Sequence, residues 1–352
     1  LKNHTLWTFL TLLTLYLSAK ILSRGHARDY ASAGLTAGLT VGTFLLGWPA
    51  CLIVAAAAAI RLSQGRPWRG EIQGVLIAAG CAIGIFFLTN PFWILDYHDA
   101  MLEMAVLGRS PASLSKPVLF IAGPLRRAVT GPFLALMFGG ALFAAWRGRK
   151  EPALLLCLCA FVMSLAGTTI LYDVTHTRIA RYFLGGIAIG SLLAARAALE
   201  LWRKNALGRA AVAAVVLNLA LNGFTYARNF HLDDSGHSSK IRAGEWIEAN
   251  IPPGESLGLL HLPQPSNSPL FRWDRYHLVF VELTVFKSLP RAELPRYLLV
   301  KTMDVDDKPY LGDNLAQYAR IAIFGREELL PWLPVDETST TANPIFEVYR
   351  LK

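Results

Sequence analysis

The chain has 352 residues, of which 53% are hydrophobic and 17% are charged, and its mean hydropathy is +0.38. This composition excludes an ordinary soluble domain and a fibrous chain, and it favours an integral membrane protein. The formal net charge of +9 comes from residues 1–227, which hold 20 Lys and Arg against 8 acidic residues, whereas residues 228–352 hold 14 against 17. Because the basic residues form short clusters between apolar runs, we expect no nucleic-acid partner.

Apolar runs of membrane-spanning length fill the first two thirds of the chain. A helix needs about 20 mostly apolar residues to cross the hydrocarbon core of a bilayer. The runs that qualify are residues 6–22, 74–89, 132–146, 152–171, 182–201 and 210–226. One further apolar stretch, residues 30–62, is either one long helix or two short helices, and Pro49 favours a break.

The distribution of basic residues decides between these two counts. With two helices, four connections on one side carry three cations each: Lys20, Arg24 and Arg28; Arg61, Arg66 and Arg69; Arg147, Arg149 and Lys150; and Arg203, Lys204 and Arg209. With one helix, the first cluster would lie opposite the other three. Short cytoplasmic loops carry the excess of Lys and Arg. We therefore predict a polytopic α-helical membrane protein with about eight transmembrane helices in residues 1–227.

Residues 228–352 have the composition of a small soluble α/β domain, which this topology places on the outer face. A helix is predicted over residues 239–250, ending at Ile251-Pro252-Pro253-Gly254. Short apolar runs bounded by turn residues predict strands at residues 257–260, 277–283, 297–300, 321–324 and 345–349. About 120 residues are enough to close a core.

Several short motifs resemble those of a known family. They are Trp7-Thr8-Phe9, Leu15-Tyr16-Leu17, Arg28-Asp29-Tyr30 with the following Ala33-Gly34-Leu35-Thr36-Ala37-Gly38-Leu39, Leu88-Thr89-Asn90-Pro91-Phe92, the set His176, Arg178, Arg181 and Tyr182, and Arg242 with Trp246-Ile247 and Ile251-Pro252-Pro253-Gly254. In these motifs the chain resembles the lipid-carrier-dependent glycosyltransferases of the GT-C fold, which include bacterial protein O-mannosyltransferases and aminoarabinose transferases.

The resemblance implies a membrane enzyme that takes a sugar from a polyprenyl-phosphate carrier and passes it, with inversion, to a lipid or protein acceptor. The expected location is the bacterial inner membrane, with the reaction and the soluble domain on the outer face. In that family an acidic residue after the first transmembrane helix activates the acceptor, and this chain has no counterpart. We therefore expect the carboxy-terminal part of such an enzyme, whose soluble domain covers the membrane cavity or binds the acceptor.

The connection at residues 172–182 is the first candidate site. Arg178 and Arg181 are one helical turn apart, and a guanidinium pair suits a phosphate leaving group. His176 joins them as a predicted carrier-phosphate ligand, and Tyr172 and Asp173 as predicted substrate-loop residues. The alternative is that these cations anchor a helix end at lipid headgroups.

The long connection at residues 90–130 holds the other candidates. Arg126 and Arg127 lie on the predicted outer side, against the usual charge bias, and we interpret them as ligands of the carrier phosphate or of lipid headgroups. Asp96, His98 and Asp99 follow the Asn90-Pro91 break and have the side chains of an acid/base or metal set. We interpret these three as a substrate loop and expect no divalent metal and no cofactor other than the lipid-linked sugar.

Gly34, Gly38 and Gly42 recur on one helix face, which predicts close helix packing or, alternatively, room for an isoprenoid tail. Two other functions stay open at this point. One is a non-enzymatic membrane subunit with an outer docking domain. The other is a transporter, which the nearly charge-free spans and the lack of a sequence repeat disfavour.

Overall fold

The computed structural model describes residues 3–98, 125, 129–171, 183–234, 236, 238–260, 268–280, 283–302, 308–325 and 344–352. The chain forms two compact units, Leu1–Asn218 and Leu219–Lys352. The boundary predicted at residue 227 lies in the same helix as this division, α11 (Ala206–Asp234). We call the two parts unit 1 and unit 2 and describe each by itself.

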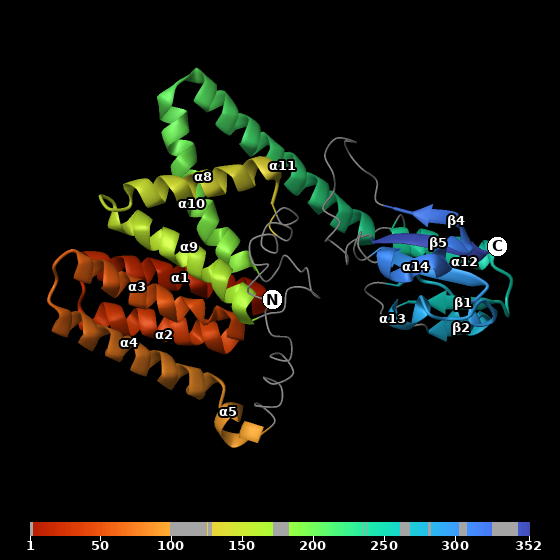
Figure 1. Ribbon diagram of the computed structural model, residues 1–352, viewed down its shortest axis with the longest axis horizontal. Helices are drawn as coiled ribbons and strands as arrows, with labels where there is room; N and C mark the ends of the chain where they lie inside the picture. Colours follow the sequence, from red (N-terminus) through yellow and green to blue (C-terminus); the bar gives the residue numbers. More distant parts are fainter. Residues whose placement is uncertain are drawn as a thin grey trace. The chain divides into compact units, whose positions relative to one another are not determined.

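Helices make up unit 1, and they lie at the eight positions predicted from the apolar runs (Figure 1). They are α1 (Asn3–Ser23), α2 (Ala27–Thr43), α3 (Pro49–Ser63), α4 (Trp68–Thr89), α8 (Gly131–Arg147), α9 (Pro152–Leu171), α10 (Leu184–Lys204) and α11. The predicted break in residues 30–62 is confirmed, since α2 ends at Thr43 and α3 begins at Pro49, where proline is tolerated in the first helical turn. A short 3-10 turn, Leu45–Gly47, joins them.

Four described helices are long and apolar enough to cross a membrane: His4–Ser23, Trp68–Thr89, Leu184–Lys204 and Ala206–Thr225. Three apolar helices are shorter, Pro49–Ser63, Gly131–Arg147 and Pro152–Gly167. The 15 residues of α3 rise only about 22 Å at 1.5 Å per residue, less than the hydrocarbon core of a bilayer. The described part of the chain therefore supports four candidate spans, and the prediction of eight spans is not supported.

The glycines of α2 are packing residues. A Cβ on Gly34 would overlap the backbone of Ala78 in α4, and a Cβ on Gly38 would overlap that of Ala82. One turn further, a Cβ on Gly42 would lie 2.5 Å from the amide nitrogen of the Asn90 side chain. The packing interpretation is confirmed, and the alternative of room for an isoprenoid tail fails at these positions, because α4 fills the space.

Unit 2 is an α/β sandwich in which all five predicted strands are confirmed. The sheet has the order β2-β1-β3-β5-β4, with β1 (Ser256–Leu259), β2 (His277–Phe280), β3 (Tyr297–Thr302), β4 (Tyr318–Phe324) and β5 (Ile345–Leu351). The predicted helix is confirmed as α12 (Ser239–Asn250), which covers one face through Ala243 and Ile247. Two helices that we did not predict, α13 (Leu283–Phe286) and α14 (Lys308–Ala316), cover the other face.

Strand direction gives unit 2 one distinctive edge. Strands β2, β1 and β3 run parallel, and β5 runs antiparallel to both β3 and β4. Strands β1 to β4 therefore share one direction and end at the same edge of the sheet, which we call the carboxyl edge. Helix α12 leads directly into β1, so its first turn lies at this edge.

Candidate functional site

Most of the predicted site residues lie outside the described residues. These are Tyr172, Asp173, His176, Arg178, Arg181, Arg126, Arg127 and Asp99. Asp96 and His98 are described and are exposed, just after the short helix α5 (Phe92–Leu95). Within the described ranges no three His, Cys, Asp or Glu side chains are grouped as metal ligands, and the expected absence of a metal stays a prediction.

A buried ionic network joins the ends of four helices in unit 1. The Nε of Arg61, in the last turn of α3, donates to the Oε1 of Glu71 at 2.8 Å, in the first turn of α4. Tyr30 of α2 donates its hydroxyl to the other carboxylate oxygen. The Nη1 of Arg61 also donates to the carbonyls of Ile21 and Leu22 at the end of α1, at 3.0 and 3.2 Å.

Backbone geometry makes room for this network. Gly25, between α1 and α2, has a φ of +66°, and a Cβ there would overlap the guanidinium of Arg61. Arg61 and Glu71 are 6% and 4% exposed. Each charge is met by an opposite charge or by hydrogen bonds, and the cation lies at helix-end carbonyls, where the helix dipole favours it. The network therefore connects the ends of the four helices α1, α2, α3 and α4, and its polar groups bond to one another.

This network corrects the assignment of Arg61 to a connection between helices, because Arg61 lies in the last turn of α3. The connection between α3 and α4 is short, so it brings the end of one helix beside the start of the next. Arg61 consequently meets Glu71 instead of solvent. Arg66 and Arg69 of the same cluster are exposed.

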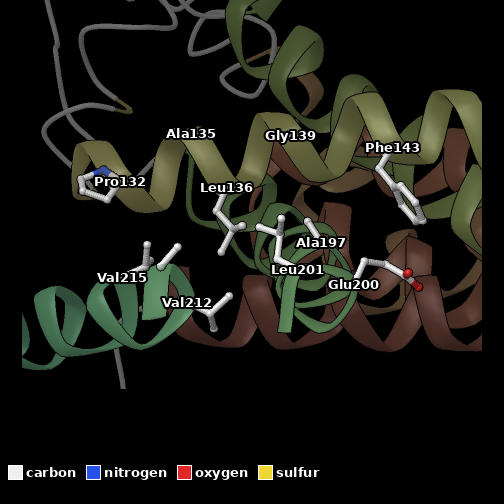
Figure 2. A pocket seen from close by; sticks show the side chains of 11 residues that line it. Pro132, Ala135, Leu136, Gly139, Phe143, Ala197, Glu200, Leu201, Val212 and Val215 are labelled. Atoms are coloured by element: carbon white, nitrogen blue, oxygen red, sulfur yellow. The ribbon is translucent and has the colours of Figure 1, made fainter. Parts of the chain in front are cut away.

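Unit 1 has a pocket of about 440 Å³ between α8, α10 and α11 (Figure 2). Its lining is apolar except for Glu200: Pro132, Ala135, Leu136, Gly139, Phe143, Ala197, Leu201, Ala211, Val212 and Val215 complete it. The α8 residues recur every three or four positions and form one face of that helix. In Figure 2 the side chain of Leu136 faces those of Val212 and Val215 across the pocket.

Two neighbouring glycines of α8 have different roles at this pocket. A Cβ on Gly140 would overlap the carbonyl oxygen of Leu193, so this glycine lets the backbones of α8 and α10 touch. A Cβ on Gly139 would meet nothing within 4 Å, so that position borders open space. The pocket volume falls within the range of small-molecule sites, about 300 to 1,000 Å³, and its apolar lining suits a hydrocarbon chain.

One end of the pocket carries a paired ionic cluster. The Nη1 of Arg196 lies 2.9 Å from the Oε1 of Glu200, and the Nη2 of Arg196 lies 3.3 Å from the Oε1 of Glu151. Arg147 lies 3.1 Å from the same Glu151 oxygen. The guanidinium of Arg196 also lies 5.7 Å from the centre of the Phe143 ring. Glu200 is thus neutralised by a cation and leaves the pocket without an isolated charge.

No protein-family model, curated protein or solved structure matches this chain.

Sequence reasoning missed both the ionic network and the pocket. A signal for the network was present, because Arg61 and Glu71 are charged residues at the two ends of a short turn between apolar runs. No sequence pattern indicated the pocket. Its lining residues are of types common in apolar helices, and they come from three separate helices.

Proposed function

We propose that this chain binds a sugar linked to a polyprenyl phosphate and serves the transfer of that sugar to a lipid or protein acceptor on the outer face of a bacterial inner membrane. The observation that carries the proposal is the apolar pocket between α8, α10 and α11. In unit 1, which holds the candidate membrane spans, such a pocket suits the isoprenoid chain of the carrier. The family motifs at Arg28-Asp29-Tyr30 and Asn90-Pro91 add support.

Two arginines that could meet the carrier phosphate lie shortly before this pocket's first residue in the sequence. Arg126 and Arg127 precede Pro132, the first pocket residue of α8, by six and five positions. In the proposal the isoprenoid tail lies along α8 and its phosphate meets these arginines, with Arg178, Arg181 and His176 as further ligands. Guanidinium groups stabilise the charge that develops on the phosphate as the glycosyl bond breaks.

The proposal also includes the membrane layout. Helices α2 and α3 pack against α1 and α4, which are candidate spans, so the shorter helices are proposed to lie at the same depth in the bilayer. All eight helices would then cross together, and unit 2 would share the outer compartment with residues 172–182. Single cysteines introduced into unit 2 test this, because a membrane-impermeant thiol reagent applied from the outside labels them in intact cells only if the layout holds.

Gly139→Leu tests the pocket itself. A Cβ at this position meets nothing within 4 Å, so the added side chain extends from there into the cavity. We expect photo-crosslinking of a polyprenyl-phosphate sugar analogue to α8 and α11 in the wild type and its loss, by about tenfold or more, in the variant. A tenfold loss of affinity corresponds to about 1.4 kcal/mol of binding free energy.

Matched variants separate this result from general damage. Gly80→Leu introduces the same side chain at another open position, in α4, and should leave crosslinking unchanged. Arg126→Gln with Arg127→Gln should weaken it, whereas Arg149→Gln, at an exposed cation between α8 and α9, should not. Wild-type protein that takes up no lipid-linked sugar would contradict the proposal and would favour the non-enzymatic membrane subunit.

A further inference from the structure

Two buried polar atoms near one end of the apolar pocket lack a hydrogen-bond partner among the described residues. They are the Oγ1 of Thr130, the residue before α8, and the Oδ1 of Asn218 in α11. Asn218 lies in a candidate membrane span, Ala206–Thr225, where a bilayer offers no water to replace the missing partner. A buried polar group without a partner destabilises the fold, so each of these two atoms requires an explanation.

Asn218 lies on the face of α11 that lines the pocket. It follows Ala211 and Val215, two of the lining residues, by seven and three positions. Residues at these spacings lie on one side of a helix. The apolar lining that α11 contributes is therefore followed, one turn after Val215, by an amide.

Thr130 lies at the same end of the pocket. It is the N-cap residue of α8, but its hydroxyl makes no capping hydrogen bond, and Pro132, the second helical residue, has no N–H to offer. Figure 2 shows Pro132 and Val215 at one end of the pocket and Glu200 at the other. Thr130 precedes Pro132 by two positions and Asn218 follows Val215 by three, so both polar side chains belong to the end opposite Glu200.

The hydrogen-bonding capacity of these two groups indicates the class of ligand. An amide oxygen only accepts, so it needs an N–H or O–H donor, whereas a hydroxyl both donates and accepts. An isoprenoid tail and a phosphodiester carry no such donor, but every sugar carries several hydroxyl groups. A sugar hydroxyl satisfies the Asn218 amide in either orientation of its oxygen and nitrogen.

We propose that Thr130 and Asn218 hydrogen-bond the hydroxyl groups of the donor's sugar and so distinguish a sugar-loaded carrier from one that has no sugar. This inference rests on the proposed function, because it takes the pocket as the site of the isoprenoid tail. It adds a group of the donor, the sugar, to which no residue has been assigned so far.

Two photoreactive probes with the same tail and the same charge test the assignment. They are farnesyl phosphate mannose and farnesyl methyl phosphate, each with a diazirine in the tail, and only the first carries sugar hydroxyls. Crosslinking to the full chain in detergent, measured over a range of probe concentrations, gives the two affinities. The wild type should bind the sugar probe about tenfold more tightly, because the methyl probe leaves both buried groups unpaired.

Variants of similar size connect this preference to the two side chains. Asn218→Leu and Thr130→Val should each weaken binding of the sugar probe about fivefold and leave binding of the methyl probe unchanged. Thr130→Ser, which retains the hydroxyl, should keep the wild-type ratio of the two affinities. Thr43→Val is the matched control, because the Thr43 hydroxyl donates to the carbonyl of Leu39 at 2.8 Å within α2. Equal losses for both probes in Asn218→Leu and Thr130→Val would indicate a purely structural role and would overturn the inference.

The outcomes also separate this inference from the proposal on which it rests. Wild-type protein that takes up neither probe contradicts the donor site and, with it, the recognition of the sugar. Equal affinity for the two probes retains the donor site and overturns only the recognition of the sugar. Unlabelled phosphatidylglycerol, whose headgroup has hydroxyls but no sugar, should not displace the sugar probe, and displacement at equal concentration would assign Thr130 and Asn218 to an ordinary phospholipid instead.

Discussion

Buried positive charges have opposite surroundings in the two units. In unit 1, Arg61 is enclosed by a carboxylate and by two helix-end carbonyls. In unit 2, Lys301 is as deeply buried, its Nζ makes no hydrogen bond to a described residue, and its charged neighbour in the described residues is another lysine. A satisfied buried charge fixes helices in place, whereas an unsatisfied one imposes a cost on the fold.

The largest expected effect comes from breaking the satisfied pair. Glu71→Gln leaves the guanidinium of Arg61 buried without a negative charge, which should reduce the free energy of unfolding of unit 1 by about 3 to 5 kcal/mol. Titration with a denaturing detergent, followed by pulse proteolysis, measures the change. Arg66→Gln, which removes an exposed cation of the same connection, should have no measurable effect.

The double replacement Arg61→Met with Glu71→Met sharpens this result. Two apolar side chains of similar length remove both buried charges, so most of the lost stability should return. A double variant as unstable as Glu71→Gln would show that the network does more than neutralise Arg61.

The second effect is a pH dependence that only the unsatisfied lysine should produce. Burial lowers the pKa of Lys301 from 10.5 in the unperturbed group to about 8 in the folded chain. Between these values the unfolded chain retains a proton that the folded chain has released, so stability rises with pH. From pH 8 to 9.5, the gain for unit 2 should be about 2 kcal/mol.

Pulse proteolysis of unit 2 in urea measures this slope. Lys301→Met should abolish it and should be more stable than the wild type at pH 8, because the buried amine is gone. A wild type whose stability is flat over the same interval would mean that Lys301 keeps its proton, and the contrast with Arg61 would disappear.

A smaller effect is expected from Tyr30→Phe. The substitution removes one hydrogen bond to the carboxylate of Glu71 while the pair with Arg61 remains, so unit 1 should lose about 1.5 kcal/mol. Tyr97→Phe, at a position 61% exposed, is the control in the same denaturation assay. No loss in Tyr30→Phe would show that Arg61 alone satisfies the carboxylate.

The smallest effect is expected at Glu347 of unit 2, whose carboxylate accepts hydrogen bonds from Arg320 and Tyr349. Arg320→Gln removes the cation from Glu347, but Arg320 is half exposed and Tyr349 still donates to the carboxylate. We expect a loss of about 1 kcal/mol in the urea assay. Exposed Arg350→Gln serves as the control, and a loss as large as that of Glu71→Gln would show that partial exposure does not weaken the pair.

Local pattern predicted most of the secondary structure. Apolar length located the eight long helices in the described part of unit 1, Pro49 located the break between α2 and α3, and short apolar runs located the five described strands. These features depend on neighbours in the sequence, since a helix or strand is specified by residues a few positions apart. The number of candidate spans was overestimated, because α2, α3, α8 and the apolar part of α9, Pro152–Gly167, are each too short.

The sequence by itself determined the apolar helical character of unit 1 and the α/β character of unit 2, and it favoured close packing along Gly34 and Gly38. Only the tertiary structure decided which charges meet and which spaces stay open. Tyr30, Arg61 and Glu71 come from three helices, Lys240 and Lys301 are 61 positions apart, and the pocket is closed by α8, α10 and α11. Such contacts depend on how elements pack, and periodicity along a single element carries no information about that.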